Sequence, residues 1–490
     1  MKMKNIIVNN YKILITITAI LIVIGVLFIK PQVGVADQGD FDRIMHISGL
    51  SLLEKDESNL YFIRFYHYIV PEYQISEIDK ISKTIKGCSI SYLIVFVSKI
   101  CKLSGQTVFK TQYLAIIYSI LYIFAFIITL KSLNIKDRFK LIIISSLIVF
   151  IFFDGNYLVW FNSLYGEPMM IVTFSLFIAF VLNYIHYKYV IKGTKHLMLR
   201  IVPIVIAAFL FLGSKLQVTT SLPFIIFVVG KIIWDNRRIL GKLSLASLCI
   251  CVYILILYPI GIGNNSDNLS KDTEYNSVFY GVLNGSKTPK QDLIDLGLNP
   301  DLSVEAGKHS YLDTDEYVKY IPGAEITNEE FYSKISNSKL AKFYLTHPSR
   351  LLKGMEYTAG KAFNTSTLLG KCSQSYSETP VVKFQRFTLW SYIREHVLPK
   401  KLYFIVSIYL IIILFTVHKY ISNKWNLEVR NKILLLWVVM LIGAVQFPMP
   451  FVGNGMADTA KQLFLFNFIF DGLLLLIFSY ALLKIIKAHF

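Results

Sequence analysis

The sequence predicts an all-α integral membrane protein built as a bundle of about ten transmembrane helices. The 490-residue chain is 54% hydrophobic and has a mean hydropathy of +0.53, which soluble proteins of this length do not need. Apolar runs of roughly 17–22 residues recur along the chain, and this is the length that crosses a bilayer as a helix. Short charged pieces separate these runs, and Tyr and Phe are abundant, as expected of membrane-interface aromatics.

Each predicted span is one apolar run, and several spans extend into flanking polar residues. In chain order they cover 13–30, 111–130, 140–153, 169–187, 201–213, 218–234, 243–262, 401–418, 432–447 and 462–483. With the N-terminus on the cytoplasmic side, every strongly basic segment between spans falls on that same side.

The net charge of +18 is concentrated in six short segments. These hold 21 of the 50 Lys and Arg residues and only three acidic residues, whereas the remainder of the chain carries 29 of each sign. They are residues 1–13, 131–140, 188–200, 231–242, 419–432 and 484–490. Because cytoplasmic loops are enriched in Lys and Arg, this distribution indicates membrane orientation and argues against a nucleic-acid groove. We therefore expect a multi-pass protein of the cytoplasmic membrane with no nucleic-acid partner.

Two long stretches are predicted to lie outside the membrane, and they divide the chain into three parts. The N-terminal transmembrane module, 1–262, includes a first external loop at 31–110. Residues 263–400 form an extracytoplasmic, mostly helical segment that packs on the bundle as a lid. Residues 401–490 supply the C-terminal transmembrane helices.

The first external loop is predicted to lie along the bilayer surface. Its stretches 41–53 and 60–70 have the apolar spacing and aromatic density of interfacial helices. The apolar stretch SISYLIVFVSKICKL, at 89–103, does not fit as a span, because counting it would invert every later basic loop. We expect it to be re-entrant or interfacial, as short apolar runs often are.

Polar side chains gather at the predicted outer ends of four chain-distant helices. The stretch VADQGDFDRIM (35–45) places three aspartates within about two helical turns of the bilayer edge. The candidate site residues are Asp37, Asp40, Arg43, Glu167, Lys215, Gln217, Asp458 and Lys461. Ionisable groups at membrane depth are costly and are therefore functional candidates by default.

Several of these candidates also have a structural interpretation. Asp40 precedes an amphipathic run and suits a helix N-cap, and Glu167 suits the first turn of a helix. Asp458 and Lys461 are three residues apart and could pair only with each other. The Tyr and Trp of NYLVWF (156–161) suit an interfacial aromatic belt.

A cluster of this kind suits sugar transfer from a lipid-phosphate donor at the outer membrane surface. The acceptor hydroxyl needs a carboxylate to take its proton, and Asp37 or Asp40 could serve. The departing phosphate needs cations, and Lys215, Arg43 or Lys461 could supply one. A single displacement at the anomeric carbon would invert its configuration. The sequence contains no G-x-x-x-x-G-K-[ST] loop, so no nucleotide hydrolysis is implied.

Six motifs in chain order resemble those of a known family. They are ADQGDFDRIM, YLVWFNSLYGEP, GSKLQ, SVFYGVLNGS…DLIDLGLNP, YLTHPSRLL and GNGMADTAKQLFLFN. They are similar to motifs of the WsfD-like glycan-biosynthesis hexose transferases of Gram-positive bacteria, and the order of parts resembles the GT-C glycosyltransferase superfamily. The resemblance implies a GT-C-like bundle, a polyprenyl-phosphate sugar donor and a cell-wall or surface glycan acceptor. It also implies a catalytic acid in the first external loop, which is Asp37 or Asp40.

The resemblance leaves the use of a metal open. Some GT-C enzymes hold a divalent ion with paired acids, which Asp37 and Asp40 could provide with Glu167 or Asp154 as a third ligand. Others place Lys or Arg on the phosphate, and Lys215 favours this metal-free alternative. The five cysteines show no metal-ligand spacing, so we expect no cofactor and no disulfide framework.

Two other functions are compatible with a polytopic chain of this kind. A flippase for lipid-linked sugars would show broken helices, internal repeats and charges near the bilayer midplane, and the sequence shows no repeat. A polysaccharide polymerase or ligase would place essential Arg and His in a large external segment, where Arg350, Arg386 and His347 are candidates.

Overall fold

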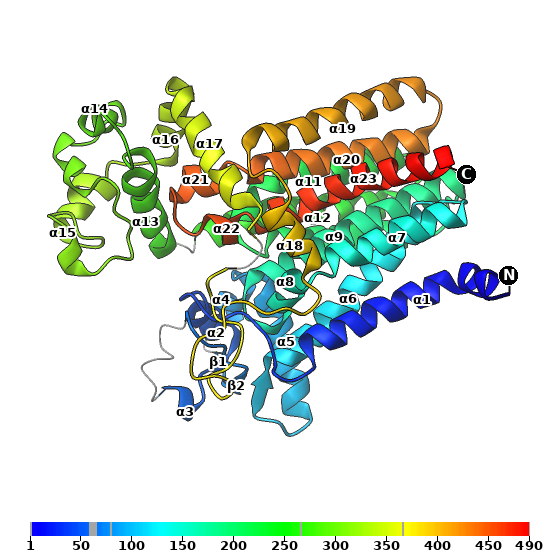
Figure 1. The fold of residues 1–490 in the computed structure, drawn as a ribbon, viewed down its shortest axis with the longest axis horizontal. Coiled ribbons are helices and arrows are strands. Elements are labelled where there is room, and N and C mark those ends of the chain that lie inside the picture. The colour runs from blue at the N-terminus through cyan, green and yellow to red at the C-terminus, as the bar shows by residue number, and fades with distance from the viewer. Residues whose placement is uncertain (1, 58–65, 79–80, 265–266, 365–366, 490) are drawn as a thin grey trace.

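The computed structural model describes residues 2–57, 66–78, 81–264, 267–364 and 367–489. A bundle of long helices carries both chain ends at one extremity, and two smaller modules lie at the other (Figure 1). The bundle helices are α1 (Lys2–Leu27), α6 (Thr111–Ser132), α7 (Arg138–Phe152), α9 (Gly166–Ile185), α10 (Met198–Leu212), α11 (Leu222–Asn236), α12 (Lys242–Asn264), α19 (Leu402–Ser422), α20 (Leu427–Gln446) and α23 (Phe464–His489).

Short elements connect or extend these helices. They are α8 (Gly155–Leu158), η2 (Val159–Asn162), η3 (His186–Val190), η4 (Leu216–Ser221), α21 (Met449–Asn454) and α22 (Thr459–Gln462). The centre of the bundle is α9, which is apolar on all sides, as a helix surrounded by other helices must be. Together with η3 it forms a candidate span that is 83% buried, whereas only 17% of the span in α12 is buried.

Every apolar run predicted to span the membrane is helical, which confirms an all-α membrane protein. Among the described residues, seven helices are long and apolar enough to cross a bilayer. The pair formed by α7 and the stretch Gly155–Asn162 is an eighth if its 53° bend lies within one span. The apolar helices Ile13–Leu27 and Met198–Leu212 are shorter, so the predicted count of about ten spans is not confirmed.

The first external loop contains a small sheet that the sequence did not reveal. Its elements are α2 (Phe41–Ser48), β1 (Leu50–Ser51), α3 (Glu54–Glu57), β2 (Glu72–Ile75), α4 (Ile81–Ile85), α5 (Ser89–Leu103) and β3 (Val108–Lys110). The strands pair antiparallel in the order β1-β2-β3. Gly49 adopts a left-handed φ of 69° and ends α2, so the single amphipathic helix predicted for 41–53 is wrong. Most of the predicted helix at 60–70 lies outside the described residues.

The stretch at 89–103 forms one helix, α5, beside the sheet. Its 15 residues give a length of about 22 Å, which is less than the thickness of a bilayer core. The interfacial or re-entrant placement stays a prediction.

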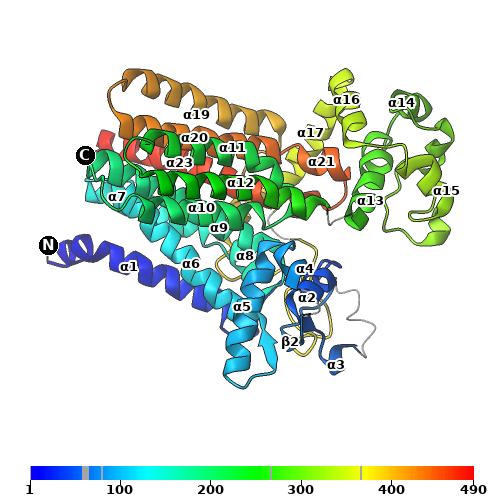
Figure 2. The same cartoon turned by 180° about the vertical axis from the view of Figure 1, so that it is seen from behind.

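Residues 263–400 are mostly helical and project from the end of the bundle that carries the first external loop (Figures 1 and 2). The elements are α13 (Asp267–Tyr275), η5 (Asn276–Val282), α14 (Pro289–Asp295), η6 (Pro300–Glu305), η7 (Thr314–Glu316), α15 (Glu325–Thr327), η8 (Asn328–Tyr332), α16 (Asn337–Thr346), α17 (Pro348–Ala362) and α18 (Leu389–His396). Residues 370–372 of this segment return to the first loop and pair with its backbone. The segments 31–110 and 263–400 therefore meet next to the stretch that carries Asp37 and Asp40.

Candidate functional site

The stretch that leads to Asp37 is held by backbone pairing on one side and by the bundle on the other. The N–H groups of Gly34 and Ala36 donate to the carbonyls of Lys371 and Gly370, both at 2.9 Å. On the other side, Asn162 Nδ2 donates to the Val33 carbonyl at 2.8 Å. A Cβ on Gly34 would lie 2.5 Å from the Asn162 carbonyl oxygen, so this close approach requires glycine.

Asp37 follows directly, and its carboxylate organises the turn into α2. Its Oδ1 accepts hydrogen bonds from the N–H groups of Gly39 at 2.9 Å, Asp40 at 2.9 Å and Phe41 at 3.1 Å. Asp40 occupies the N-cap position but makes no capping hydrogen bond with its side chain. The prediction that Asp40 caps this helix is therefore wrong, and Asp37 satisfies the free N–H groups instead.

The second oxygen of Asp37 is buried and free. Within the described ranges, Oδ2 has no hydrogen-bond partner, and the residue is 5% exposed. Burial raises the pKa of Asp37 to about 6, although the Phe41 N–H opposes the change. Asp37 lines a small pocket, with a cavity volume of about 10 Å³, together with aromatic and apolar side chains that include Phe41, Tyr68 and Tyr73. A carboxylate with this pKa and an unused oxygen can accept a proton near neutral pH.

The pKa of Asp40 is shifted in the opposite direction to that of Asp37. Its Oδ2 lies 2.6 Å from Lys461 Nζ, and its Oδ1 lies 3.8 Å from Arg43. Burial alone would raise the pKa of Asp40, but the charges of Lys461 and Lys215 outweigh burial and hold it well below its ordinary value. Asp40 is therefore a permanent anion that fixes a lysine, and it is a weaker proton acceptor than Asp37.

A second ion pair lies beside the first. Lys215 Nζ is 2.6 Å from Glu167 Oε1, and the Glu167 side chain is only 1% exposed. Glu167 lies in the first turn of α9, where a carboxylate interacts favourably with the helix dipole. Burial disfavours the Lys461 ammonium, but Asp40 and then Glu167 raise the pKa of Lys461 above its ordinary value. The two pairs therefore act on one another.

Gln38 joins this cluster to the loop before α23, and sequence reasoning missed it. Its Nε2 donates to Asp458 Oδ1 at 2.5 Å, and its Oε1 accepts from Lys461 Nζ at 3.1 Å. Lys461 thus turns to Asp40 and Gln38, so the alternative that it pairs only with Asp458 is wrong. The ammonium also lies 4.3 Å from the centre of the Tyr165 ring, within cation–π range.

Two residues considered from sequence, Gln217 and Asp154, make hydrogen bonds that hold neighbouring elements together. Gln217 Nε2 donates to Gln446 Oε1 at 2.7 Å and to the Gln462 carbonyl at 2.6 Å, and so ties η4 to α20 and α22. Asp154 caps α8 and accepts hydrogen bonds from the backbone and side chain of Ser391, so both of its carboxylate oxygens are engaged. Among described residues, no group of three or more His, Cys, Asp or Glu side chains is arranged to hold a metal. Metal-free chemistry stays a prediction.

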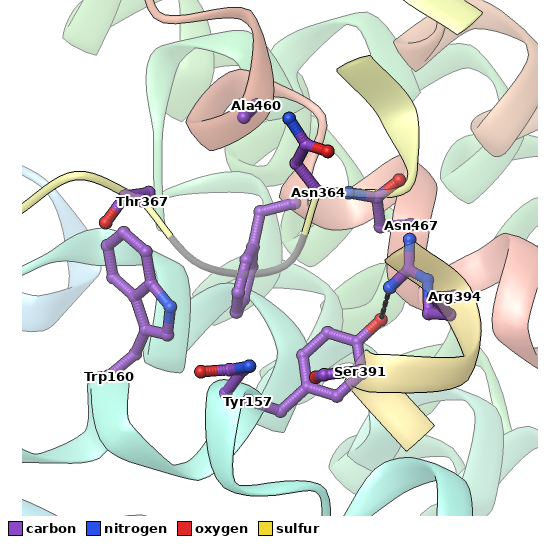
Figure 3. Close-up of a pocket in the computed structure, with 10 residues that line it drawn as sticks. Tyr157, Trp160, Asn364, Thr367, Ser391, Arg394, Ala460 and Asn467 are labelled. Carbon is purple, nitrogen blue, oxygen red and sulfur yellow. Dashed lines mark hydrogen bonds between the residues drawn. The ribbon is translucent and has the colours of Figure 1, made fainter. Parts of the chain in front are cut away.

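A small pocket with a cavity volume of about 10 Å³ lies between Trp160 and Arg394 (Figure 3). Its wall combines three amides, two hydroxyls, one guanidinium and aromatic rings: Asn156, Asn364, Asn467, Thr367, Ser391, Arg394, Tyr157, Trp160 and Phe464. The Trp160 ring packs edge-on against Tyr165 with centroids 5.1 Å apart. Trp160 and Tyr157 are at most 3% exposed, so the interfacial belt predicted for these rings is wrong.

A fully buried ion pair supports this pocket. Arg394 Nη1 lies 3.2 Å from Asp471 Oδ2, and both side chains are 0% exposed. The same oxygen accepts hydrogen bonds from Tyr157 at 2.7 Å and Trp390 at 2.8 Å. The sequence signal for this group was available, because Asp471 is an acid inside the last apolar run.

Comparison with known proteins adds a family. Residues 1–489 match the family described as YfdI N-terminal transmembrane domain. No curated protein and no solved structure matches the chain. The family fits a membrane protein of glycosyltransferase type, whereas the WsfD-like resemblance stays a prediction. With this match over nearly its whole length and its apolar helices, the chain is a multi-pass membrane protein that belongs to the YfdI N-terminal transmembrane domain family.

Proposed function

We propose that the protein transfers a hexose from a polyprenyl-phosphate donor to a cell-wall or surface glycan outside the cytoplasmic membrane. The observation that carries the proposal is the Asp37 carboxylate, which has one unused oxygen and a pKa of about 6 and lies three residues before Asp40, the partner of Lys461. The cluster lies where the first external loop meets the end of the bundle (Figure 1). A donor bound there would keep its lipid tail in the bilayer and its sugar outside.

The proposed reaction is a single displacement. An acceptor hydroxyl oxygen attacks the anomeric carbon while the bond from that carbon to the phosphate oxygen breaks. The hydroxyl proton passes to Asp37 Oδ2, and polyprenyl phosphate leaves with the bonding electron pair. Because attack and departure occur on opposite faces, the anomeric configuration inverts. The backbone N–H groups on Oδ1 hold the carboxylate in position throughout.

Lys215 is the proposed contact for the departing phosphate. An ammonium has three donors, and Lys215 uses one of them on Glu167, with its side chain 26% exposed. Lys461 already donates to both Asp40 and Gln38 and is only 9% exposed. Lys461 therefore contributes positive charge and holds Asp40 and Gln38 in place. Lys215 retains donors that can offset the negative charge developing on the phosphate.

We place the hexose ring at the pocket of Figure 3, which has a cavity volume of about 10 Å³ and must widen to admit a sugar. Its amides and hydroxyls match a ligand that both donates and accepts hydrogen bonds around its edge. The Oδ1 atom of Asn467 is buried with no partner among the described residues, so a ligand hydroxyl can satisfy it. Trp160 offers a flat apolar surface to the sugar face.

The polymerase or ligase alternative draws less support, because two of its three candidate side chains, Arg386 and His347, are engaged in structural contacts, and within the described ranges only Arg350 keeps free donors. Arg386 Nη1 donates to the Val26 and Ile29 carbonyls at the end of α1. His347 stacks on Phe343 with ring centroids 4.3 Å apart. None of these contacts brings the two side chains toward Asp37.

The experiment is transfer by the purified protein in nanodiscs, with defined polyprenyl-phosphate hexoses and an isolated wall glycan. The proposal expects hexose incorporation and an anomeric configuration in the product opposite to that of the donor, read by NMR. Retained configuration, or no turnover with any polyprenyl-phosphate hexose, would contradict it. Asp37→Asn should lose transfer, and Asp42→Asn is its matched control, since Asp42 is an exposed carboxylate in the first turn of the helix that follows Asp37.

A further inference from the structure

A third pocket, with a cavity volume of about 20 Å³, lies between residues 263–400 and the bundle. The side chains that define it are Asn284, Tyr344, Arg350, Lys353, Phe451 and Met456, which come from α16, α17, α21 and the loops after η5 and α21. It is separate from the aspartate cluster and from the pocket of Figure 3, with which it shares no lining residue.

Arg350 is fixed on one edge and open on the other. Its Nη2 donates to both oxygens of Asp292, at 2.8 and 3.0 Å, and to Ser286 Oγ at 2.8 Å. Within the described part of the chain, Nε and Nη1 make no hydrogen bond. A guanidinium presents five donors in a rigid fork, so Asp292 orients the group while most of its donors stay available.

Three more donors in this pocket lack a matching acceptor. The Tyr344 hydroxyl is buried without a hydrogen-bond partner among the described residues, and the residue is only 4% exposed. The Asn284 amide donates to the sulfur of Met456, a weak acceptor, at 3.1 Å. Lys353 forms no ion pair within the described ranges. Buried polar groups are nearly always satisfied, so the unpaired Tyr344 hydroxyl points to an absent partner.

The donor set indicates the chemistry of that partner. Arginine, lysine, the tyrosine hydroxyl and the amide all donate, and among the residues that the structure describes no Asp or Glu lines the pocket. A ligand that accepts several hydrogen bonds and carries negative charge matches this set, as a phosphate or a carboxylate does. The Phe451 ring in the same wall provides an apolar surface for an attached sugar.

We propose that this pocket binds an anionic unit of the acceptor glycan, a phosphate or a carboxylate carried on a sugar. The inference rests on the proposed function and names the acceptor's chemical class. Met456 lines the pocket, and Asp458 binds Gln38 in the aspartate cluster. These positions are two residues apart, so their Cα atoms lie within about 7 Å. A glycan held here would therefore reach the cluster through neighbouring units.

The test measures binding of three soluble probes to the full-length protein in nanodiscs: a hexose 6-phosphate, a hexuronate and the unmodified hexose. We expect at least one charged probe to bind more tightly than the neutral sugar, and the tighter one identifies phosphate or carboxylate. Lys353→Met should weaken that probe roughly 10- to 100-fold, as loss of a charge-assisted hydrogen bond does, and Lys353→Arg should restore most of the affinity.

Two further variants separate binding from folding. Tyr344→Phe should weaken the charged probe several-fold without lowering the thermal midpoint of the free protein, because the lost hydroxyl has no partner there. Lys342→Met, on the exposed side of α16, should bind as the wild type does. Unchanged affinity in Lys353→Met, or equal or undetectable binding of all three probes, would overturn the proposal. Because no transfer is measured, an inactive protein that binds through Lys353 would contradict only the proposed function.

Discussion

Replacing Asp37 by asparagine should abolish transfer and leave the protein as stable as the wild type, or more so. The substitution keeps an oxygen that can accept from the N–H groups of Gly39, Asp40 and Phe41. It removes only the ionisable second oxygen, the proposed proton acceptor. Loss of a general base typically lowers the rate by about 10²–10⁴-fold. In the wild type, the transfer rate should rise as pH increases through about 6, where Asp37 loses its proton.

The stability effect follows from the sign of the pKa change. Asp37 ionises near 3.8 in the unfolded chain but at about 6 in the folded protein, so the unfolded chain releases its proton first. Folding of the wild type is therefore penalised progressively between these pH values, by about 3 kcal/mol at pH 7, because each tenfold change in acidity is worth about 1.4 kcal/mol. Asparagine avoids this penalty but buries an unpaired amide, which costs about 1–3 kcal/mol. The net expectation at pH 7 is about 0–2 kcal/mol of stabilisation.

The assay compares thermal midpoints in detergent from pH 4 to 8 with transfer rates for Asp37→Asn, Asp40→Asn and Asp42→Asn. Asp40→Asn should destabilise the protein by about 2 kcal/mol, because Lys461 loses its charged partner. The cost is lower than for a fully buried ion pair because about a third of the Asp40 side chain is exposed. Asp42→Asn should match the wild type. Wild-type transfer by Asp37→Asn, or a midpoint that shows the same pH dependence with and without the Asp37 carboxylate, would refute the reasoning.

Three further substitutions test the surrounding structure. Lys215→Met should raise the KM for the donor and destabilise the protein by about 3–5 kcal/mol, because Glu167 is left buried and unpaired. Adding Glu167→Gln to this variant should restore the thermal midpoint but not donor binding. Arg394→Met should cost a similar 3–5 kcal/mol by stranding Asp471. The double change with Asp471→Asn, whose amide oxygen can still accept from Tyr157 and Trp390, should recover part of the loss, as measured by thermal midpoints. Gly34→Ala should lower both the midpoint and the transfer rate, since its Cβ would meet a backbone oxygen at the end of η2 at 2.5 Å.

The helical bundle was predictable because its signals are local. Apolar length and loop charge depend on adjacent residues, and every predicted run is a helix. The sheet of the first loop was not predictable, because its strands are two to four residues long and the residues that pair are more than twenty positions apart. Strands this short have no periodicity that a sequence pattern can show.

The candidate site was predictable as a set of charges but not as a set of partners. Sequence placed Asp37 and Asp40 together without distinguishing them. The distinction depends on Lys461, more than 400 positions away, and on a turn in which Asp37 rather than Asp40 takes the backbone N–H groups. Gln38 was missed because an amide between two aspartates carries no charge signal, yet it bridges Asp458 and Lys461.

The most direct measurement of the central claim is a structure with a non-transferable polyprenyl-phosphate hexose analogue bound. The account predicts a phosphate oxygen within hydrogen-bond distance of Lys215 Nζ and the hexose among the side chains of Figure 3. It also predicts that the face of the anomeric carbon opposite the phosphate is open to Asp37 Oδ2. A phosphate bound away from both Lys215 and Lys461, or an anomeric carbon that Asp37 cannot approach through one acceptor hydroxyl, would contradict it.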